Sequence, residues 1–179
     1  AIHQILAGYA DGDAISREAV LLRDIFRGWG CASDIYVDPD RVSPSLRSDC
    51  VPLAGYQAGP GDICLHQYGI ASPALDVFLA SPARRVLIYQ NITPARYFRG
   101  FDDRVAARLD AARAALPAAA RRVDAVWATS AYNAAELQAL GVPNVRPLPL
   151  FYAPDPEAGK PAPGGEPLFK ECRLKTILF

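Results

Sequence analysis

The sequence has no excess of charge of either sign and no long hydrophobic run. Its 19 lysines and arginines balance 19 aspartates and glutamates, so the formal net charge is zero. Such a balance provides no basic surface of the kind that attracts nucleic acid or an anionic membrane. No apolar run approaches the roughly 20 residues that a membrane-spanning helix needs, and no signal peptide opens the sequence. We therefore expect a cytoplasmic protein without a nucleic-acid partner, whose contact with membranes is at most peripheral.

Cysteine and histidine are too few and too scattered to suggest a metal centre. His3 and His66 are the two histidines, and the four cysteines have no metal-ligand spacing. We expect no metal and no bound cofactor. The thiols should be reduced and, where buried, inert; they belong to Cys31, Cys50, Cys64 and Cys172.

Three common catalytic and nucleotide-binding motifs are also missing. The loop "GYADGDAI" has glycines at Gly8 and Gly12 but lacks the G-x-G-x-x-G spacing of a dinucleotide site. There is no P-loop lysine and no G-x-S-x-G nucleophile motif. These absences argue against a flavodoxin-like or dinucleotide-binding protein and against a serine hydrolase. A glycine turn at a helix N-terminus can still approach an anion or a sugar closely.

Strands alternate with helices along most of the chain. Apolar runs rich in β-branched and aromatic residues predict the strands, and helical periodicity fills the intervals. This alternation, with several strands apolar throughout, predicts an α/β fold: a Rossmann-like three-layer sandwich with a mostly parallel sheet. The strands are expected at residues 2–7, 33–37, 62–68, 84–89, 123–129 and 144–150.

The helices carry recognisable start and stop signals. Gly12 or Asp13 should cap the first helix. Two more are expected to begin where proline follows a hydroxyl residue, at Ser72 and Thr93. The second of these is rich in alanine and arginine, and Pro117 should break or kink it.

The composition changes near residue 151. "YAPDPEAGKPAPGGEP" carries five prolines and three glycines, which is typical of a linker. We therefore predict a Rossmann-like domain at residues 1–151, a Pro/Gly-rich linker at 152–167, and a residual tail at 168–179 that resembles the start of a further domain.

Polar side chains gather where the predicted strands end. Because crossovers in parallel sheets are right-handed, all these ends meet at one edge, where α/β proteins bind ligands. Hydroxyl and amide groups there suit a polyol better than a metal or nucleic acid. Helix capping would explain the three hydroxyl residues equally well, and a structural hydrogen bond would explain the histidine. The candidates are Gly12, Asp13, His66, Ser72, Gln90, Asn91, Thr93 and Ser130.

Four motifs, in order and spacing, resemble the amino-terminal half of bacterial glycosyltransferases of family 4, also called group 1. The resemblance runs from about residue 2 to residue 150, and N-I-T-P with G-D-A-I is its most specific part. The motifs are "GDAIS" at 12–16, "LHQYGIAS" at 65–72, "YQNITPARYF" at 89–98 and "SAYNAAELQALG" at 130–141.

The resemblance implies one half of a glycosyltransferase-B fold. In that family the amino-terminal domain receives a carbohydrate or glycolipid acceptor, and the carboxyl-terminal domain holds most of the nucleotide-sugar, the co-substrate. Transfer retains the anomeric configuration and does not usually need a metal. Carried over to this chain, the resemblance implies a catalytic role for His66 and Gln90, and substrate binding by Gly12, Asp13, Ser72, Asn91, Thr93 and Ser130.

The chain departs from the family pattern in two ways. Relatives often have histidine where this chain has Gln90, and glutamine can hydrogen-bond a hydroxyl but cannot take a proton near neutral pH. The donor-binding domain is also absent from the sequence, so we expect the chain to be inactive without it. The alternative is a non-catalytic carbohydrate-binding or interaction module on the same scaffold.

Overall fold

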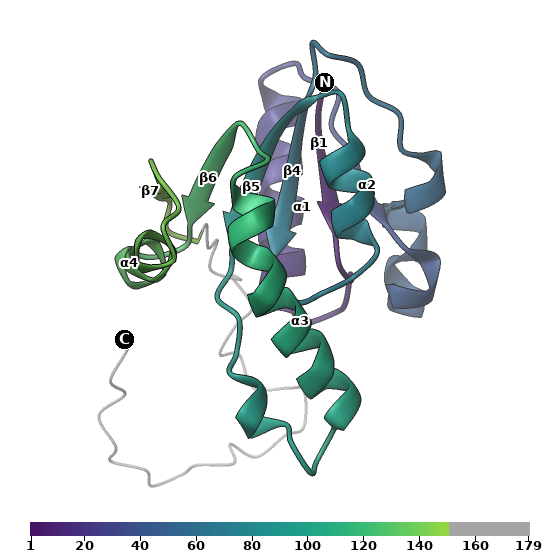
Figure 1. The fold of residues 1–179 in the computed structure, drawn as a ribbon. Coiled ribbons are helices and arrows are strands. Elements are labelled where there is room, and N and C mark those ends of the chain that lie inside the picture. Colours follow the sequence, from purple (N-terminus) through teal and green to yellow (C-terminus); the bar gives the residue numbers. More distant parts are fainter. Residues whose placement is uncertain (151–179) are drawn as a thin grey trace, which may run out of the picture.

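A computed structural model of the chain describes residues 1–150, and in it seven strands form one sheet (Figure 1). The strand order is β3-β2-β1-β4-β5-β6-β7, and every neighbouring pair is parallel. The predicted Rossmann-like α/β class is therefore confirmed. The predicted linker and tail, 152–167 and 168–179, lie outside the described residues. The strands are β1 (Ile2–Leu6), β2 (Ile35–Val37), β3 (Val51–Pro52), β4 (Ile63–Tyr68), β5 (Arg84–Tyr89), β6 (Ala125–Ala128) and β7 (Arg146–Pro147).

Helices cover both faces of the sheet. In Figure 1, α2 and α3 lie in front of the strands, α1 lies behind them, and α4 lies beside β6 and β7. Within residues 1–150, no helix is both long enough and apolar enough to cross a membrane. The helices are α1 (Ala14–Gly28), α2 (Ala74–Ala80), α3 (Asp103–Ala120) and α4 (Ala131–Ala139), and short 3₁₀ turns occupy Pro39–Arg41, Pro44–Asp49, Leu53–Gly55 and Ala95–Tyr97.

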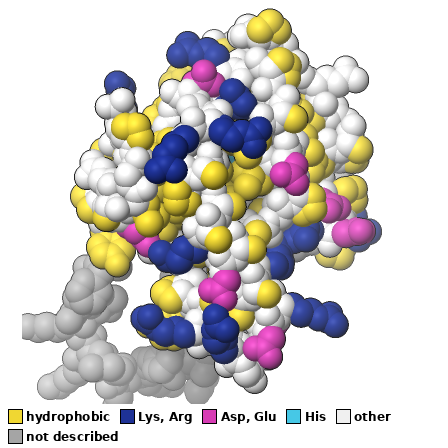
Figure 2. Space-filling view, in the orientation of Figure 1, with side chains coloured by type: hydrophobic (Ala, Val, Ile, Leu, Met, Phe, Trp, Pro, Cys, Tyr) yellow, Lys and Arg dark blue, Asp and Glu magenta, His cyan; other side chains and the backbone are white. Residues whose placement is uncertain are grey.

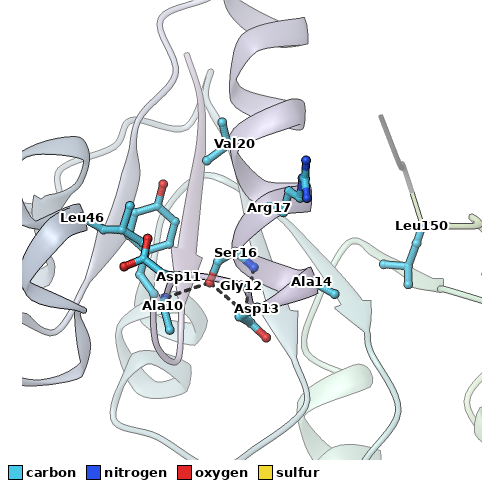
Figure 3. Close-up of a pocket in the computed structure, with 11 residues that line it drawn as sticks. Ala10, Asp11, Gly12, Asp13, Ala14, Ser16, Arg17, Val20, Leu46 and Leu150 are labelled. Atoms are coloured by element: carbon cyan, nitrogen blue, oxygen red, sulfur yellow. Dashed lines mark hydrogen bonds between the residues drawn. The ribbon is translucent and has the colours of Figure 1, made fainter. Parts of the chain in front are cut away.

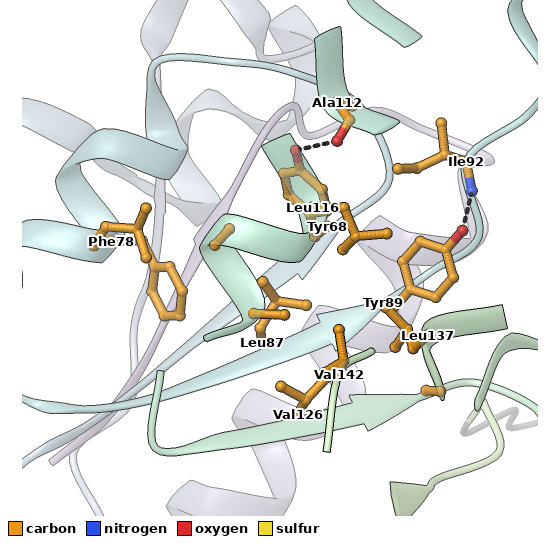
Figure 4. Packing of buried hydrophobic residues seen from close by; sticks show 14 of the residues in the cluster. Tyr68, Phe78, Leu87, Tyr89, Ile92, Ala112, Leu116, Val126, Leu137 and Val142 are labelled. Carbon is orange, nitrogen blue, oxygen red and sulfur yellow. Dashed lines mark hydrogen bonds between the residues drawn. The ribbon is translucent and has the colours of Figure 1, made fainter. Parts of the chain in front are cut away.

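Successive side chains of the central strands point to opposite faces of the sheet and pack into two hydrophobic layers. Leu87 of β5 packs with Phe78 of α2 and Leu116 of α3 in the larger cluster (Figure 4). Its neighbour Ile88 packs in a second cluster with Leu22 of α1. Each fully buried leucine or phenylalanine side chain contributes about 1.5–3 kcal/mol. These layers make the sheet a rigid base for the loops at its carboxyl edge.

Two of the predicted caps hold the loops that begin at that edge. Asp13 caps α1 by accepting a hydrogen bond of 2.8 Å from the backbone N–H of Ser16. Ser130 caps α4 by accepting one of 3.0 Å from the N–H of Asn133. Each cap satisfies a helix donor that would otherwise have no partner.

The predictions that Ser72 and Thr93 cap helices are wrong. Ser72 Oγ is buried without a hydrogen-bond partner, and no side chain caps α2. After Thr93 the chain forms only a 3₁₀ turn, and α3 begins ten residues later, where Asp102 accepts hydrogen bonds from the N–H groups of Arg104 and Val105. A carboxylate two or three residues ahead of free N–H groups is the stronger cap.

Pro117 does not break α3, which continues to Ala120. Proline removes one N–H donor from a helix and crowds the preceding turn. Because Pro117 lies in the last turn, this effect reaches back only to the carbonyl of Arg113, and most of the helix is unaffected. Buried Leu116 and Ala119, on either side of it, keep that turn packed on the sheet.

Candidate functional site

The order of the strands reverses at β1, which has β2 on one side and β4 on the other. Ligands of open α/β sheets bind at such a point, beyond the carboxyl ends of the strands. A cavity of about 670 Å³ lies there. We call it the switch-point pocket. The loop after β1 lines it with Asp13, the end of β4 with Gln67, and the segment after β5 with Gln90, Asn91 and Thr93.

Four of the eight candidate residues therefore meet in one cavity, although up to 80 positions separate them in the sequence. They are Asp13, Gln90, Asn91 and Thr93. The convergence follows from the parallel topology, which delivers the ends of β1, β4 and β5 to the same edge. The other four candidates do not line this pocket.

His66 lies inside the core and not at the rim where the sequence placed it. Its side chain is fully buried, with its ring 5.1 Å from that of Phe78. Nδ1 lies 2.8 Å from the carbonyl oxygen of Ile5 and must donate to it, because a carbonyl only accepts. Burial lowers the pKa of His66 to about 4, partly offset by that hydrogen bond. Along β4 successive side chains alternate between faces, so Gln67, the next residue, faces the pocket instead.

Ser72, Ser130 and Gly12 are also outside the switch-point pocket. Ser72 is partly buried with its Oγ unpartnered, and Ser130 serves as the cap of α4. Gly12 has φ +73°, a conformation that favours glycine, and it turns the chain into α1. It lines a second cavity on the other side of the same loop.

This second cavity, about 550 Å³, lies along the first turns of α1 (Figure 3). Asp13 lines both cavities. Its carboxylate accepts a hydrogen bond of 2.7 Å from Ser16 Oγ, which in turn accepts one of 3.0 Å from the N–H of Ala10. These bonds hold the loop between the two cavities in one conformation.

The predicted site residues did not include two buried polar residues beside the pocket, Glu18 and Gln67, each about 2% exposed. Gln90 Nε2 donates to Glu18 Oε2 at 2.8 Å and to Gln67 Oε1 at 2.5 Å. Gln67 Nε2 is buried and has no partner among the described residues. One signal was available: Glu18 stands on the apolar stripe of α1 beside Ala19 and Leu22, where a carboxylate is unexpected.

A second network holds the segment after β5. Tyr89 Oη donates to Glu136 Oε2 at 2.6 Å and accepts a bond of 3.3 Å from the N–H of Ile92. Arg113 binds the other carboxylate oxygen of Glu136 and the carbonyl of Ile92. Burial opposes ionisation of Glu136, but the bonds from Tyr89 and Arg113 outweigh it and hold the pKa of this carboxyl below its usual value.

Asn91 is the strained point of this segment. Its φ is +70°, in the left-handed region that asparagine tolerates better than most residues. Its carbonyl oxygen lies only 3.4 Å from the position that a Cβ on Gly69 would occupy. The ends of β4 and β5 thus approach each other closely, and the glycine permits it.

No family model matches the sequence, and no curated protein matches it either. Solved structures do resemble the fold. One is an alpha-glucosyltransferase in complex with UDP (TM-score 0.53, 14% identity, 82% of this chain and 43% of that one). Another is an alpha-glucosyltransferase in complex with UDP and a 13-mer DNA containing a central A:G mismatch (TM-score 0.51, 15% identity, 82% and 40%).

This chain thus spans about two fifths of the length of the structures it matches. At such low sequence identity the likeness concerns the fold. The described part of the chain has the fold of a glycosyltransferase-B-like domain.

Proposed function

We propose that this chain is the acceptor-binding domain of a retaining glycosyltransferase of family 4, and that the switch-point pocket binds the acceptor. The observation that carries the proposal is the convergence of Gln67, Gln90, Asn91 and Thr93 at the strand reversal of a glycosyltransferase-B-like fold. In the complete enzyme a second domain would present a nucleotide-sugar, as the UDP-bound structural neighbours suggest.

The pocket offers matched partners for a hydroxyl group. Gln67 Nε2 is an unused donor, while Gln90 Oε1 is an acceptor with no hydrogen bond to a described residue. A sugar hydroxyl both donates and accepts, so one hydroxyl can bind both amides. Asn91 and Thr93 are exposed and add further polar groups. Hydrogen bonds to buried polar groups favour specificity, because a ligand without the hydroxyl leaves them unpaired.

Asp13 lines both cavities at this edge of the sheet. Its Oδ2 holds the cap of α1, and Oδ1 makes no hydrogen bond to a described residue. Gln90 cannot serve as a general base, since an amide does not ionise near neutral pH. We therefore expect the chain to bind acceptor but to require a donor-binding domain for transfer, with no bound cofactor.

A titration of the ¹⁵N-labelled chain with a panel of neutral sugars and polyols tests this function. We expect shifts in the side-chain amide signals of Gln67, Gln90 and Asn91, and an affinity at least tenfold lower for Gln90→Ala. Gln138→Ala removes an exposed amide on α4 and is the matched control. The chain joined to a donor-binding domain should then transfer label from a nucleotide-sugar. Absence of both binding and transfer across the panel would overturn the proposal.

One observation favours the alternative, a non-catalytic carbohydrate-binding module. The side-chain amide of Gln90 already donates hydrogen bonds to Glu18 and Gln67. The same two assays separate the alternatives. A module should bind glycans without supporting transfer in the joined protein. An acceptor domain should do both.

A further inference from the structure

Two arginines from different elements line the switch-point pocket. Arg41 ends the 3₁₀ turn after β2, and Arg108 lies in the second turn of α3. The backbone carbonyl of Arg41 accepts a 2.9 Å bond from the N–H of Tyr9. Arg108 Nε donates to the carbonyl of Ala71 at 3.1 Å, and the N–H of Ala71 donates to the carbonyl of Arg108 at 3.3 Å. Arg41 is thus tied to the loop after β1, and Arg108 to the loop after β4.

Neither arginine has a carboxylate partner as close as those of Arg23 and Arg113. Arg23 contacts Asp49 at 2.8 Å and Arg113 contacts Glu136 at 2.5 Å. Arg41 has only Asp38, at 3.8 Å, beyond hydrogen-bond distance. Within residues 1–150, Arg108 forms no ion pair, and its terminal Nη groups have no hydrogen-bond acceptor.

The two guanidinium groups also act on each other. Burial lowers the pKa of Arg108, and the positive charge of Arg41 lowers it further. Two like charges that line one partly desolvated cavity oppose each other, and an anion placed between them would relieve that repulsion. Figure 2 shows both arginine and acidic side chains on the viewed face.

A separate observation points to a ligand in the same cavity. Gln67 is about 2% exposed, lines the pocket, and has a buried Nε2 donor without a partner. A native protein rarely leaves such a donor unsatisfied. The pocket therefore presents three donor groups, the Gln67 amide and the two guanidinium groups, beside the acceptor oxygens of Asp13 and Gln90.

We propose that the acceptor carries a phosphate group, which binds between Arg41 and Arg108 while its hydroxyls reach Gln67 and Gln90. This inference rests on the proposed acceptor function and adds the chemical class of the acceptor. The guanidinium fork matches two phosphate oxygens and forms charge-assisted hydrogen bonds with them. The phosphate belongs either to a soluble sugar phosphate or to a lipid head group.

Calorimetric titration of the full chain with glucose, glucose 6-phosphate and inorganic phosphate tests the subsite. We expect glucose 6-phosphate to bind at least tenfold more tightly than glucose, with an affinity that falls as salt rises. Arg41→Gln and Arg108→Gln should each weaken glucose 6-phosphate about tenfold and leave glucose unchanged. Arg104→Gln, on the same helix but exposed and outside the pocket, should change neither.

Arg108 also supports the loop at Ala71, so its replacement could unfold the protein. A thermal melt of each variant therefore accompanies the titrations. If Arg108→Gln unfolds, Arg41→Gln decides the test, because the Arg41 side chain makes no hydrogen bond to a loop within residues 1–150.

Sedimentation with vesicles of phosphatidic acid or phosphatidylcholine identifies the source of the phosphate. Arginine-dependent binding to the phosphatidic acid vesicles alone would support a lipid head group, and arginine-dependent binding to glucose 6-phosphate without vesicle binding a soluble one. Equal binding of glucose and glucose 6-phosphate without arginine-dependent vesicle binding, or binding of glucose 6-phosphate and of the vesicles that Arg41→Gln does not change, would overturn the subsite. Arginine-dependent binding of phosphate with no sugar bound by any variant would leave the subsite standing and reject the acceptor function.

Discussion

The side-chain amide of Gln90 donates a 2.8 Å hydrogen bond to the carboxylate of Glu18, across 72 positions of sequence. This bond joins the end of β5 to the buried face of α1 directly beneath the switch-point pocket. A carboxylate buried to this extent needs partners, because burying an unpaired charge costs several kcal/mol. The pair therefore couples the stability of α1 to the position of the amide that the proposed ligand would contact.

Glu18→Leu should destabilise the protein by about 1–3 kcal/mol, because it leaves the Gln90 amide with one acceptor fewer in a partly buried site. Glu18→Gln keeps an acceptor oxygen at the same place and should lose less. Urea unfolding measures the stability of both variants. Titration of the folded variants with sugar shows whether releasing the Gln90 amide from Glu18 changes sugar affinity. A leucine variant with unchanged stability and sugar affinity would show that the bond is incidental.

Tyr89→Phe should destabilise the protein by about 1–2 kcal/mol, since it removes a hydroxyl that donates to Glu136 and accepts from the N–H of Ile92. Tyr132→Phe is the matched control, because the Tyr132 side chain is 75% exposed and its hydroxyl makes no hydrogen bond to a described residue. Its effect should stay within about 0.5 kcal/mol. Equal unfolding midpoints for the two variants would contradict the role of the network.

Asn91→Ala should destabilise the protein by about 1–2 kcal/mol, because a Cβ without a polar group is unfavourable at φ +70°. Asn91→Gly should be as stable as the parent or more so, since glycine adopts this conformation freely. Both variants lose the side-chain amide, so both should bind neutral sugars more weakly. Thermal melts measure the effect on backbone stability separately from the effect on sugar binding. A glycine variant less stable than the alanine variant would contradict the claim that Asn91 is strained.

His66 should make the protein sensitive to acid. Its pKa in the folded state is lowered to about 4, below the ordinary value of 6.5, so the unfolded chain binds the proton first as pH falls. Stability should therefore decline between about pH 6.5 and pH 4, by about 3 kcal/mol from this residue. His3, whose pKa burial also lowers, acts in the same direction.

His66→Gln removes the titration and retains an amide able to donate to the carbonyl of Ile5. The variant should lose less stability than the parent between pH 6.5 and pH 4, as measured by urea unfolding at each pH. An NMR titration of the parent should show the His66 imidazole still neutral at pH 6. A midpoint near 6.5 in the folded protein would contradict the burial seen here.

Much of the scaffold was readable from local sequence. The apolar runs of β4 and β5 were long enough to identify strands buried on both faces, and their alternation with helices implied a parallel sheet. Asp13 and Ser130 were recognisable caps because a cap depends only on the residues two or three positions ahead. The prediction that Thr93 caps a helix was wrong for the same reason. Its local pattern is typical of a helix start, but the chain forms a 3₁₀ turn there and α3 begins later.

The sequence by itself determined the order of elements and the edge at which their polar ends would meet, since these follow from local pattern and from the handedness of parallel crossovers. Only the tertiary structure decided which polar side chains reach the pocket. In a strand covered by helices on both sides, apolar alternation cannot tell one face from the other, so His66 and Gln67 were indistinguishable until the packing of α1 and α2 placed one in the core and the other in the pocket. Glu18, Arg41 and Arg108 joined the site in the same way, through contacts between distant segments that no local rule predicts.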